Sequence, residues 1–321
     1  MLLALVAGLV LAPLVTWWLH RRAVLDVPND RSSHAVPVPR GGGLAIAMAA
    51  TMAAALIDAG PEQVRLAFAA GPLAFGLLGM ADDLAPIAAR HRLGIQVVLA
   101  AGTTVLLTDH LSGPVAWQLV FTVAVAVWLI AYVNAFNFMD GINGLAVVTA
   151  MIGGATWWWL GELEDVTALR WSGAVLAVAC VGFLPFNFPR ARVFLGDVGS
   201  YFIGAWCAAV VVVGLRAGLP PEAVLAPVAI FLADTAVTLI SRFRRGEPIT
   251  VPHRDHRYQR LVAQGRSHAQ ITVAIALATA GCGLFGILAT AGGAWRAGSA
   301  AGIALVLLGY LRADVLLAPR R

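Results

Sequence analysis

A run of polar side chains and glycines between residues 134 and 145 separates two long apolar segments, and its residue types are suited to chemistry. Asn134, Asn137 and Asp140 follow one another at intervals of three residues. On a helix, positions three apart lie on the same face, so these two amides and this carboxylate would point together. Ionisable groups within an apolar membrane chain are costly and mark functional sites. The run therefore predicts a site, and a polar seam between packed helices is the alternative.

A second group surrounds Asp197, in the run Phe-Leu-Gly-Asp-Val-Gly-Ser from residue 194 to 200. Glycines on both sides of the carboxylate would let the backbone approach a phosphate closely. An oxygen-only set of Asp197, Asn137 and water suits Mg²⁺, which keeps several waters and bridges substrate phosphates. Mn²⁺ is an alternative ion, and no His or Cys set with zinc spacing accompanies the run. For Asp197 alone, a helix N-cap is the alternative.

Two further acidic positions follow or lie within apolar segments. Asp82 and Asp83 are adjacent, and adjacent carboxylates repel, so a metal ion or basic partners must offset their charge. A solvated helix end is the alternative for this pair. Asp234 lies seven residues before the end of a later apolar segment. For Asp234 we expect an ion pair with an arginine of a neighbouring helix.

A fourth polar cluster is basic. His253 and His256 are three residues apart and are interspersed with Arg254, Arg257 and Arg260. Surface histidines and a basic anchor for the membrane surface are the alternatives for this run. Taken together with the acidic groups, it predicts a metal-dependent phosphate site at one face of a membrane.

The composition indicates that this is an integral membrane protein. Of the 321 residues, 60% are hydrophobic and 12% are charged, with a mean hydropathy of +0.82, whereas soluble domains average about 25% charged residues. The fold class predicted is all-α and polytopic, with residues 1–321 forming a single membrane-embedded domain. A helix needs about 20 apolar residues to cross a bilayer. Eleven apolar segments are predicted to span it: 1–19, 41–59, 66–81, 93–108, 115–133, 142–160, 172–186, 201–215, 223–240, 269–291 and 299–317.

The basic residues fall unevenly on the two sides of these segments. All 22 are arginine, and eighteen of them lie in loops on one side. The other side holds Arg65, Arg170, Arg216 and Arg296. The positive-inside rule places the arginine-rich side in the cytoplasm, which puts the N-terminus outside and the C-terminus inside. All four polar clusters then fall on the cytoplasmic side.

The four clusters, in this order and spacing, resemble the polyprenyl-phosphate N-acetylhexosamine-1-phosphate transferases (glycosyltransferase family 4 type), which include phospho-N-acetylmuramoyl-pentapeptide transferase. The resemblance covers nearly the whole chain. The run His-Arg-Asp-His-Arg-Tyr-Gln-Arg-Leu from residue 253, together with Arg31-Ser32-Ser33-His34 and the glycines after Arg40, is most similar to the O-antigen-initiating branch. It is less similar to the muramoyl-pentapeptide branch, which has a run of three histidines.

The resemblance implies an enzyme of the bacterial inner membrane whose active site faces the cytoplasm. Undecaprenyl or another polyprenyl phosphate would attack the β-phosphorus of a UDP-N-acetylhexosamine, UMP would leave, and a lipid-linked cell-surface glycan would begin. The partners implied are the two substrates and the lipid bilayer, with no nucleic acid. The sugar, the glycan pathway and the oligomeric state, a homodimer included, stay open.

The resemblance also implies roles for individual residues. Mg²⁺ would be held by Asn137 and Asp197, and the lipid phosphate would be positioned or deprotonated by Asp82, Asp83 and Asp140. The remaining positions would bind substrate. Phe194 would stack on the uracil, with Asn187 beside it and Asn143 facing the base. Arg40 would also bind substrate, as would Arg92, which replaces a lysine of the family, and His253 and His256 would contact the phosphate or sugar. Asn143 replaces an acidic residue common in the family, and its amide can both donate and accept a hydrogen bond.

Two other classes of protein remain as alternatives. A transporter of an anionic solute or lipid would be expected to show inverted repeats and polar groups at mid-membrane, and neither is evident in the sequence. A catalytically inactive lipid-binding relative is the second alternative, and the intact acidic residues argue against it.

The arginine asymmetry predicts the outcome of topology mapping. A reporter that is active only outside the cytoplasm should work when fused after Arg65, Arg170 or Arg296. The same reporter should be silent after Arg92, Arg192 or Arg260. The reverse pattern would place the polar clusters on the wrong side for a cytoplasmic UDP-sugar.

Overall fold

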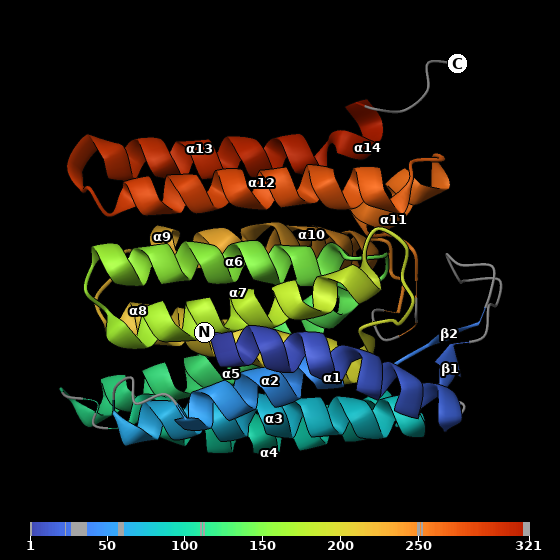
Figure 1. The fold of residues 1–321 in the computed structure, drawn as a ribbon. Coiled ribbons are helices and arrows are strands. Elements are labelled where there is room, and N and C mark those ends of the chain that lie inside the picture. The colour runs from blue at the N-terminus through green and yellow to red at the C-terminus, as the bar shows by residue number, and fades with distance from the viewer. Residues whose placement is uncertain are drawn as a thin grey trace.

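The computed structural model describes residues 2–22, 24–26, 37–56, 61–109, 111, 113–248, 251 and 253–316. Within these residues the protein is a bundle of long helices that run roughly parallel or antiparallel to one another (Figure 1). The motif Arg31–His34 and the final residues of the predicted segments 41–59 and 299–317 lie outside the described residues.

The first half of the chain forms six long helices and one small strand pair. The helices are α1 (Leu2–Arg21), α2 (Leu44–Leu56), α3 (Glu62–Leu84), α4 (Ala89–Thr108), α5 (Val115–Met139) and α6 (Leu145–Leu163). Strands β1 (Leu25–Asp26) and β2 (Val38–Pro39) pair antiparallel between α1 and α2. This short ladder fixes the chain just before Arg40.

The second half of the chain continues with long helices and several short ones. They are α7 (Thr167–Asn187), α8 (Gly196–Arg216), α9 (Pro221–Leu225), the 3₁₀ turn η1 (Ala226–Val228), α10 (Ala229–Arg244), α11 (Arg257–Ala263), α12 (His268–Ala289), α13 (Gly293–Leu311) and α14 (Ala313–Leu316). The strands, α11 and α14 lie at the same end of the bundle (Figure 1).

The helices confirm the predicted all-α membrane class. Each of the eleven predicted segments overlaps a helix or, for 223–240, the interrupted run α9–η1–α10. Among the described residues, eight helical segments are long and apolar enough to cross a membrane, and α2 is a shorter apolar helix. Two boundaries differ in a way that matters: α5 extends to Met139 and α8 begins at Gly196. Asn134 and Asn137 therefore lie on a long helix, as their spacing predicted, whereas Asp140 follows its last residue, and Asp197 lies in the first turn of α8.

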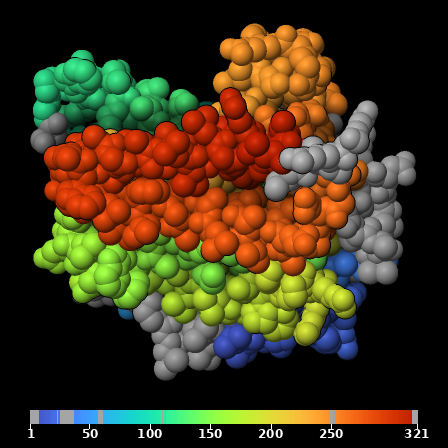
Figure 2. Space-filling model, turned by 90° about the horizontal axis from the view of Figure 1, so that it is seen from above, coloured from blue at the N-terminus to red at the C-terminus, as the bar shows by residue number. Residues whose placement is uncertain are grey.

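The centre of the bundle is α8, whose side chains are almost all buried. Helix α3 packs along one side of α8 and α5 along another, while α12 and α13 form an outer layer. Figure 2 shows α12 and α13 covering one face of the molecule, with the end of α10 projecting beside them. Cys180, Cys207 and Cys282 are all free and buried, so they act as small packing residues.

Close packing of α3 on α8 depends on the absence of a side chain at Gly79. A Cβ atom at this position would meet the backbone of Asp197 and Val198. Such overpacking of a core typically costs about 1–3 kcal/mol. Gly79→Val should therefore lower the melting temperature of the detergent-purified protein by several degrees.

Gly94→Ala is the matched control for this packing prediction. Gly94 is also within a helix, but no atom lies within 4 Å of a Cβ placed there. Alanine has the higher helix propensity, so Gly94→Ala should leave the melting temperature unchanged or raise it slightly. Equal effects of the two substitutions would show that the α3–α8 approach is not tight.

Candidate active site

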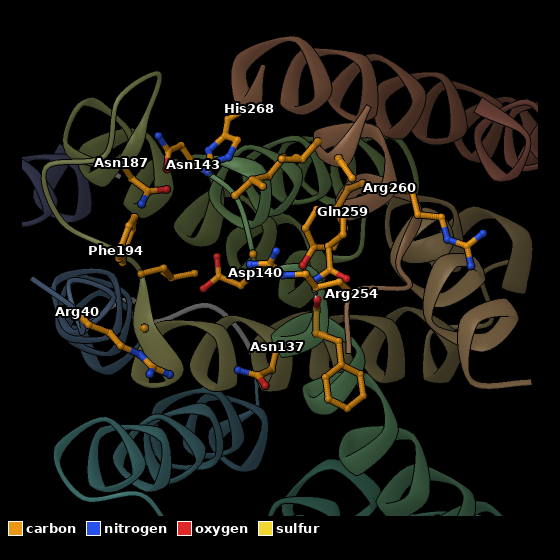
Figure 3. A pocket seen from close by; sticks show the side chains of 18 of the residues that line it. Arg40, Asn137, Asp140, Asn143, Asn187, Phe194, Arg254, Gln259, Arg260 and His268 are labelled. Atoms are coloured by element: carbon orange, nitrogen blue, oxygen red, sulfur yellow. Dashed lines mark hydrogen bonds between the residues drawn. The ribbon is translucent and has the colours of Figure 1, made fainter. Parts of the chain in front are cut away.

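A cavity of about 870 Å³ opens at the end of the bundle that carries the strands and α11. Its walls come from the end of α5 and the following turn, the end of α7, the start of α8, α11 and the start of α12. Asp140 lies between Phe194 and Asn187 on one side and Arg254 and Gln259 on the other (Figure 3). The polar lining side chains are Arg40, Asn137, Asp140, Asn143, Asn187, Asp197, Arg254, Tyr258, Gln259, Arg260, Gln264 and His268.

Arg40 joins two of the predicted carboxylates. Its Nε lies 2.7 Å from Asp83 Oδ1 and its Nη2 lies 2.8 Å from Asp197 Oδ1. The residues after Arg40 hold it there, because the amides of Gly42 and Gly43 donate to the carbonyls of Phe194 and Leu195 at 2.9 and 2.8 Å. Arg40 therefore offsets the acidic charge at the wall of the cavity and still reaches its surface.

Asp83 caps the N-terminus of α8 from a different helix. Its side chain is fully buried, and its Oδ1 and Oδ2 accept hydrogen bonds from the amides of Asp197 and Val198 at 3.1 and 3.0 Å. Free amides and the helix dipole make a helix N-terminus favourable for a negative charge. Gly196 precedes these amides with φ +75°, and a Cβ there would crowd Asp83 and Gly41. The chain can therefore enter α8 against Asp83 only with glycine at this position.

Asp82 points in another direction from Asp83. It pairs with Arg92 of α4 and accepts from the amide of Ile87 at 2.6 Å. Neither Asp82 nor Asp83 lines the cavity, although Asp82 also contacts the side chain of Asp197. The predicted roles of the pair, and of Arg92, towards the lipid phosphate stay predictions.

The donor set around Asp197 fits a hard divalent cation. Asn137 Nδ2 donates to Asp197 Oδ1 and to Ser200 Oγ, both at 2.9 Å, and no hydrogen bond to its Oδ1 is found within the described residues. The contact between the carboxyl groups of Asp82 and Asp197 calls for a shared proton or a cation. No group of three or more His, Cys, Asp or Glu side chains arranged to hold a metal is found in the described part of the chain. Mg²⁺ bound through one or two carboxylates and several waters needs no such group.

Asp140 is a second acidic side chain on the cavity wall. It follows the last residue of α5, and its amide donates to the carbonyl of Asn137 at 3.2 Å. Burial, together with the charge of Asp197, raises the pKa of Asp140 to about 8, although Arg40 acts in the opposite direction. At neutral pH this carboxyl is poised to exchange a proton.

Asn143, Asn187 and Phe194 gather at one end of the cavity, as the resemblance implied (Figure 3). Asn187 is held from two sides: its Oδ1 accepts from the amide of Gly144 at 3.0 Å and its Nδ2 donates to the carbonyl of Val193 at 3.0 Å. Asn143 Nδ2 donates to the carbonyl of Pro189 at 3.2 Å. These bonds fix two side-chain amides beside the ring of Phe194 at the cavity, an arrangement that is suited to a planar heterocycle.

The two predicted histidines lie behind the cavity wall rather than on it. His256 is buried, with its Nδ1 3.0 Å from Asp234 Oδ1, and the ring of His253 is 5.2 Å from the ring of His256. Burial, followed by the neighbouring side chains of His256 and Arg242, lowers the pKa of His253. Their predicted contacts with phosphate or sugar stay predictions. In the structure, Arg254, Gln259 and Arg260 of the same run reach the cavity instead.

The expectation for Asp234 is wrong. Within the described residues no arginine side chain pairs with it, and its partners are His256, Tyr310, Thr238 and the backbone amide of Arg257. The sequence also did not single out Gln259, Tyr258 or His268 as lining residues. Gln259 and Tyr258 are visible in the basic run, but His268 lies at the start of the next apolar segment, where only the fold brings it to the cavity.

Comparison with known proteins agrees with this geometry. The sequence model of glycosyl transferase family 4 matches residues 65–215. A phospho-N-acetylmuramoyl-pentapeptide-transferase of Desulforudis audaxviator (strain MP104C) is 32% identical over 251 residues, which cover 65% of this chain and 74% of that protein. The chain belongs to glycosyl transferase family 4.

Other members of the family are similar over most of the chain. A Bacillus subtilis (strain 168) protein named "Probable undecaprenyl-phosphate N-acetylglucosaminyl 1-phosphate transferase" is 27% identical over 86% of this chain and 80% of its own length. A decaprenyl-phosphate N-acetylglucosaminephosphotransferase of Mycobacterium leprae (strain TN) is 28% identical over 80% of this chain and 75% of its own length. With the apolar helices, these bacterial relatives indicate a multi-pass membrane protein.

The raised pKa of Asp140 predicts a pH dependence of stability. Between the ordinary value of 3.8 and about 8, the folded protein keeps the Asp140 proton while the unfolded chain has lost it. Stability from this group is therefore fully present below the unfolded pKa and falls as the pH rises through this window. Asp140→Asn should raise the melting temperature relative to wild type, by an amount that grows from pH 5 to pH 8 and then levels off. A difference that does not change with pH would contradict the assignment.

Proposed function

We propose that the protein transfers N-acetylhexosamine 1-phosphate from a UDP-sugar to undecaprenyl phosphate or a related polyprenyl phosphate. The reaction takes place at the cytoplasmic face of the bacterial inner membrane and begins a lipid-linked cell-surface glycan. The observation that carries the proposal is the cavity itself. It joins a recess for a planar base to a group of carboxylates and arginines, at the end of a bundle of apolar helices. The names of the family members above support the choice of reaction.

The chemistry needs two anionic phosphates to approach each other. An oxygen of the lipid phosphate attacks the β-phosphorus of the UDP-sugar, the bond from that phosphorus to the bridging oxygen breaks, and UMP leaves with the bridging oxygen. Arg40 on one wall and Arg254 and Arg260 on another supply fixed positive charge to offset this repulsion. Mg²⁺ held by Asp197 and Asn137 would add Lewis-acid stabilisation of the phosphoryl oxygens.

Asp140 is the group that we assign to the proton of the lipid phosphate. It lies on the cavity wall next to Asn137, and a carboxyl with a pKa of about 8 takes up and releases a proton as the pH passes from neutral to mildly alkaline. Asn187 and Asn143 orient the base, and Phe194 offers a ring face to it. Asp83 acts at a distance from the substrates, because its buried carboxylate holds Arg40 and the start of α8.

An assay of UMP release tests the proposal. Purified protein, Mg²⁺ and undecaprenyl phosphate should release UMP with one member of a panel of UDP-sugars that includes UDP-N-acetylglucosamine and UDP-N-acetylfucosamine. A transporter or an inactive relative would release none with any of them. Release that depends on the UDP-sugar but not on the lipid would indicate hydrolysis and contradict the transfer reaction.

Asp197→Asn should abolish this activity in protein that still folds. Loss of a carboxylate ligand should remove about 3 kcal/mol or more of transition-state stabilisation, which lowers turnover at least about 100-fold. Asp165→Asn is the matched control, because Asp165 is exposed, lies in the turn after α6 at the far end of the bundle, and has a positive φ that Asn tolerates. Near-wild-type turnover of Asp197→Asn would remove the metal assignment.

A further inference from the structure

Two buried carboxylates lie behind α11 and take no part in lining the cavity. Asp234 comes from the middle of α10 and Asp314 from α14. Tyr258, Gln259 and Arg260 of α11 line the cavity. This short helix is therefore held between a pair of acids and the site.

Asp234 accepts hydrogen bonds from four donors. The Thr238 hydroxyl donates at 3.1 Å, His256 Nδ1 lies at 3.0 Å, the amide of Arg257 donates at 3.0 Å, and the Tyr310 hydroxyl completes the set. Asp234 itself has no exposed surface. These donors belong to α10, to the start of α11 and to α13, so a single side chain joins three elements.

Because Asp234 is buried, the hydrogen bonds to its carboxylate are required for stability. A buried carboxylate is stable only when its oxygens are paired, and removing a partner leaves an uncompensated charge. Helix α11 has only seven residues, and so short a helix has almost no stability of its own. Its position is therefore set by the contacts at its ends rather than by its own backbone.

Asp314 holds the other side of the same helix. Its Oδ2 lies 2.9 Å from Arg257 Nη1 and 3.4 Å from Arg260 Nη1, and its carbonyl accepts from Gln264 Nε2 at 2.7 Å. Arg260 is thus shared between Asp314 and the cavity. The ion pair limits the positions that this long side chain can adopt.

The contacts continue from α11 into the cavity. The Tyr258 hydroxyl donates to the carbonyl of Phe138 at 3.0 Å, two residues before Asp140. The Gln259 side chain accepts from the amide of His256 at 3.3 Å through its Oε1, which directs the remaining end of the amide towards the cavity that Gln259 lines. A displacement of the start of α11 would therefore move both Gln259 and Arg260.

We propose that Asp234 is a positioning residue for the sugar-diphosphate substrate: it fixes α11 so that Gln259 and Arg260 bind the donor, and Asp314 restrains Arg260. This inference rests on the proposed function for the identity of the donor. Because Asp234 touches neither Arg40 nor the carboxylates at the start of α8, the use of the lipid phosphate is left unchanged.

Two substitutions test the positioning role at different strengths. Asp234→Asn removes the charge that four donors surround, and Tyr310→Phe removes one donor on α13, well behind the cavity wall. We expect KM for the UDP-sugar to rise about tenfold in Asp234→Asn and about threefold in Tyr310→Phe, with KM for undecaprenyl phosphate within about twofold of wild type. Glu222→Gln is the control, since Glu222 is paired with Arg296 at the opposite end of the bundle; it should change neither constant.

Hydrogen exchange supplies a readout that does not depend on activity. Amides 257–263 should exchange faster in both variants than in wild type, while those of α8 stay protected. If Asp234→Asn does not fold, Tyr310→Phe decides the question by the same two measurements. The inference would be overturned by any of three results: unchanged amide exchange in α11, an unchanged KM for the UDP-sugar, or an equal rise in KM for both substrates. Wild-type protein that releases no UMP would instead overturn the proposed function, whatever the exchange data show.

Discussion

The carboxylate of Asp83 at the N-terminus of α8 is the contact on which the arrangement of the site depends. It belongs to α3, yet it caps the helix that carries Asp197, and it also holds the guanidinium of Arg40. A buried negative charge is tolerated here because two backbone amides and one arginine surround it. Asp197 reaches the cavity because α8 starts at this point and in this direction. The loop before α2 is held to the same position through Arg40.

The contact of Asp83 with Arg40 and the start of α8 also affects the balance of charge at the cavity. Burial, followed by the negative charges of Asp197 and Asp83, raises the pKa of Asp140. Arg40 offsets part of this charge, and the carboxyl groups of Asp82 and Asp197 also interact with each other. The acidic side of the site is thus suited to a divalent ion, whereas Arg254 and Arg260 on α11 and the loop before it are suited to phosphates. A phosphotransferase needs a site for the cation and positive charge for the phosphates.

The two walls of the cavity are built in different ways. The acidic wall lies on the ends of long, deeply packed helices, α3, α5 and α8, and its residues are fixed by short hydrogen bonds. The basic wall lies on a seven-residue helix that depends on Asp234 and Asp314 for its position. This difference suits the reaction we propose, in which the reacting phosphates need a rigid site while the UDP-sugar has to enter and UMP has to leave.

The sequence by itself determined the helical membrane class, the apolar segments and most of the polar residues of the site. These follow from local properties: hydropathy over about 20 residues, and ionisable groups that are too costly in an apolar chain unless they serve a purpose. Asn137, Asp140 and Asp197 were identified in this way, Asn187 and Phe194 were implied by the family resemblance, and all five line one cavity. The family could be named because four short motifs occurred in order.

Only the tertiary structure decided how the polar residues divide between the cavity and its support. Sequence spacing made Asp82, Asp83, His253 and His256 look equivalent to the lining residues, but none of the four lines the cavity. Asp83 instead caps the start of α8, and His256 pairs with Asp234 of α10. The partners of Asp234 are up to 76 residues away in sequence, on α11 and α13. The direction in which a side chain points depends on how helices from distant parts of the chain pack, and local sequence patterns carry no information about that packing.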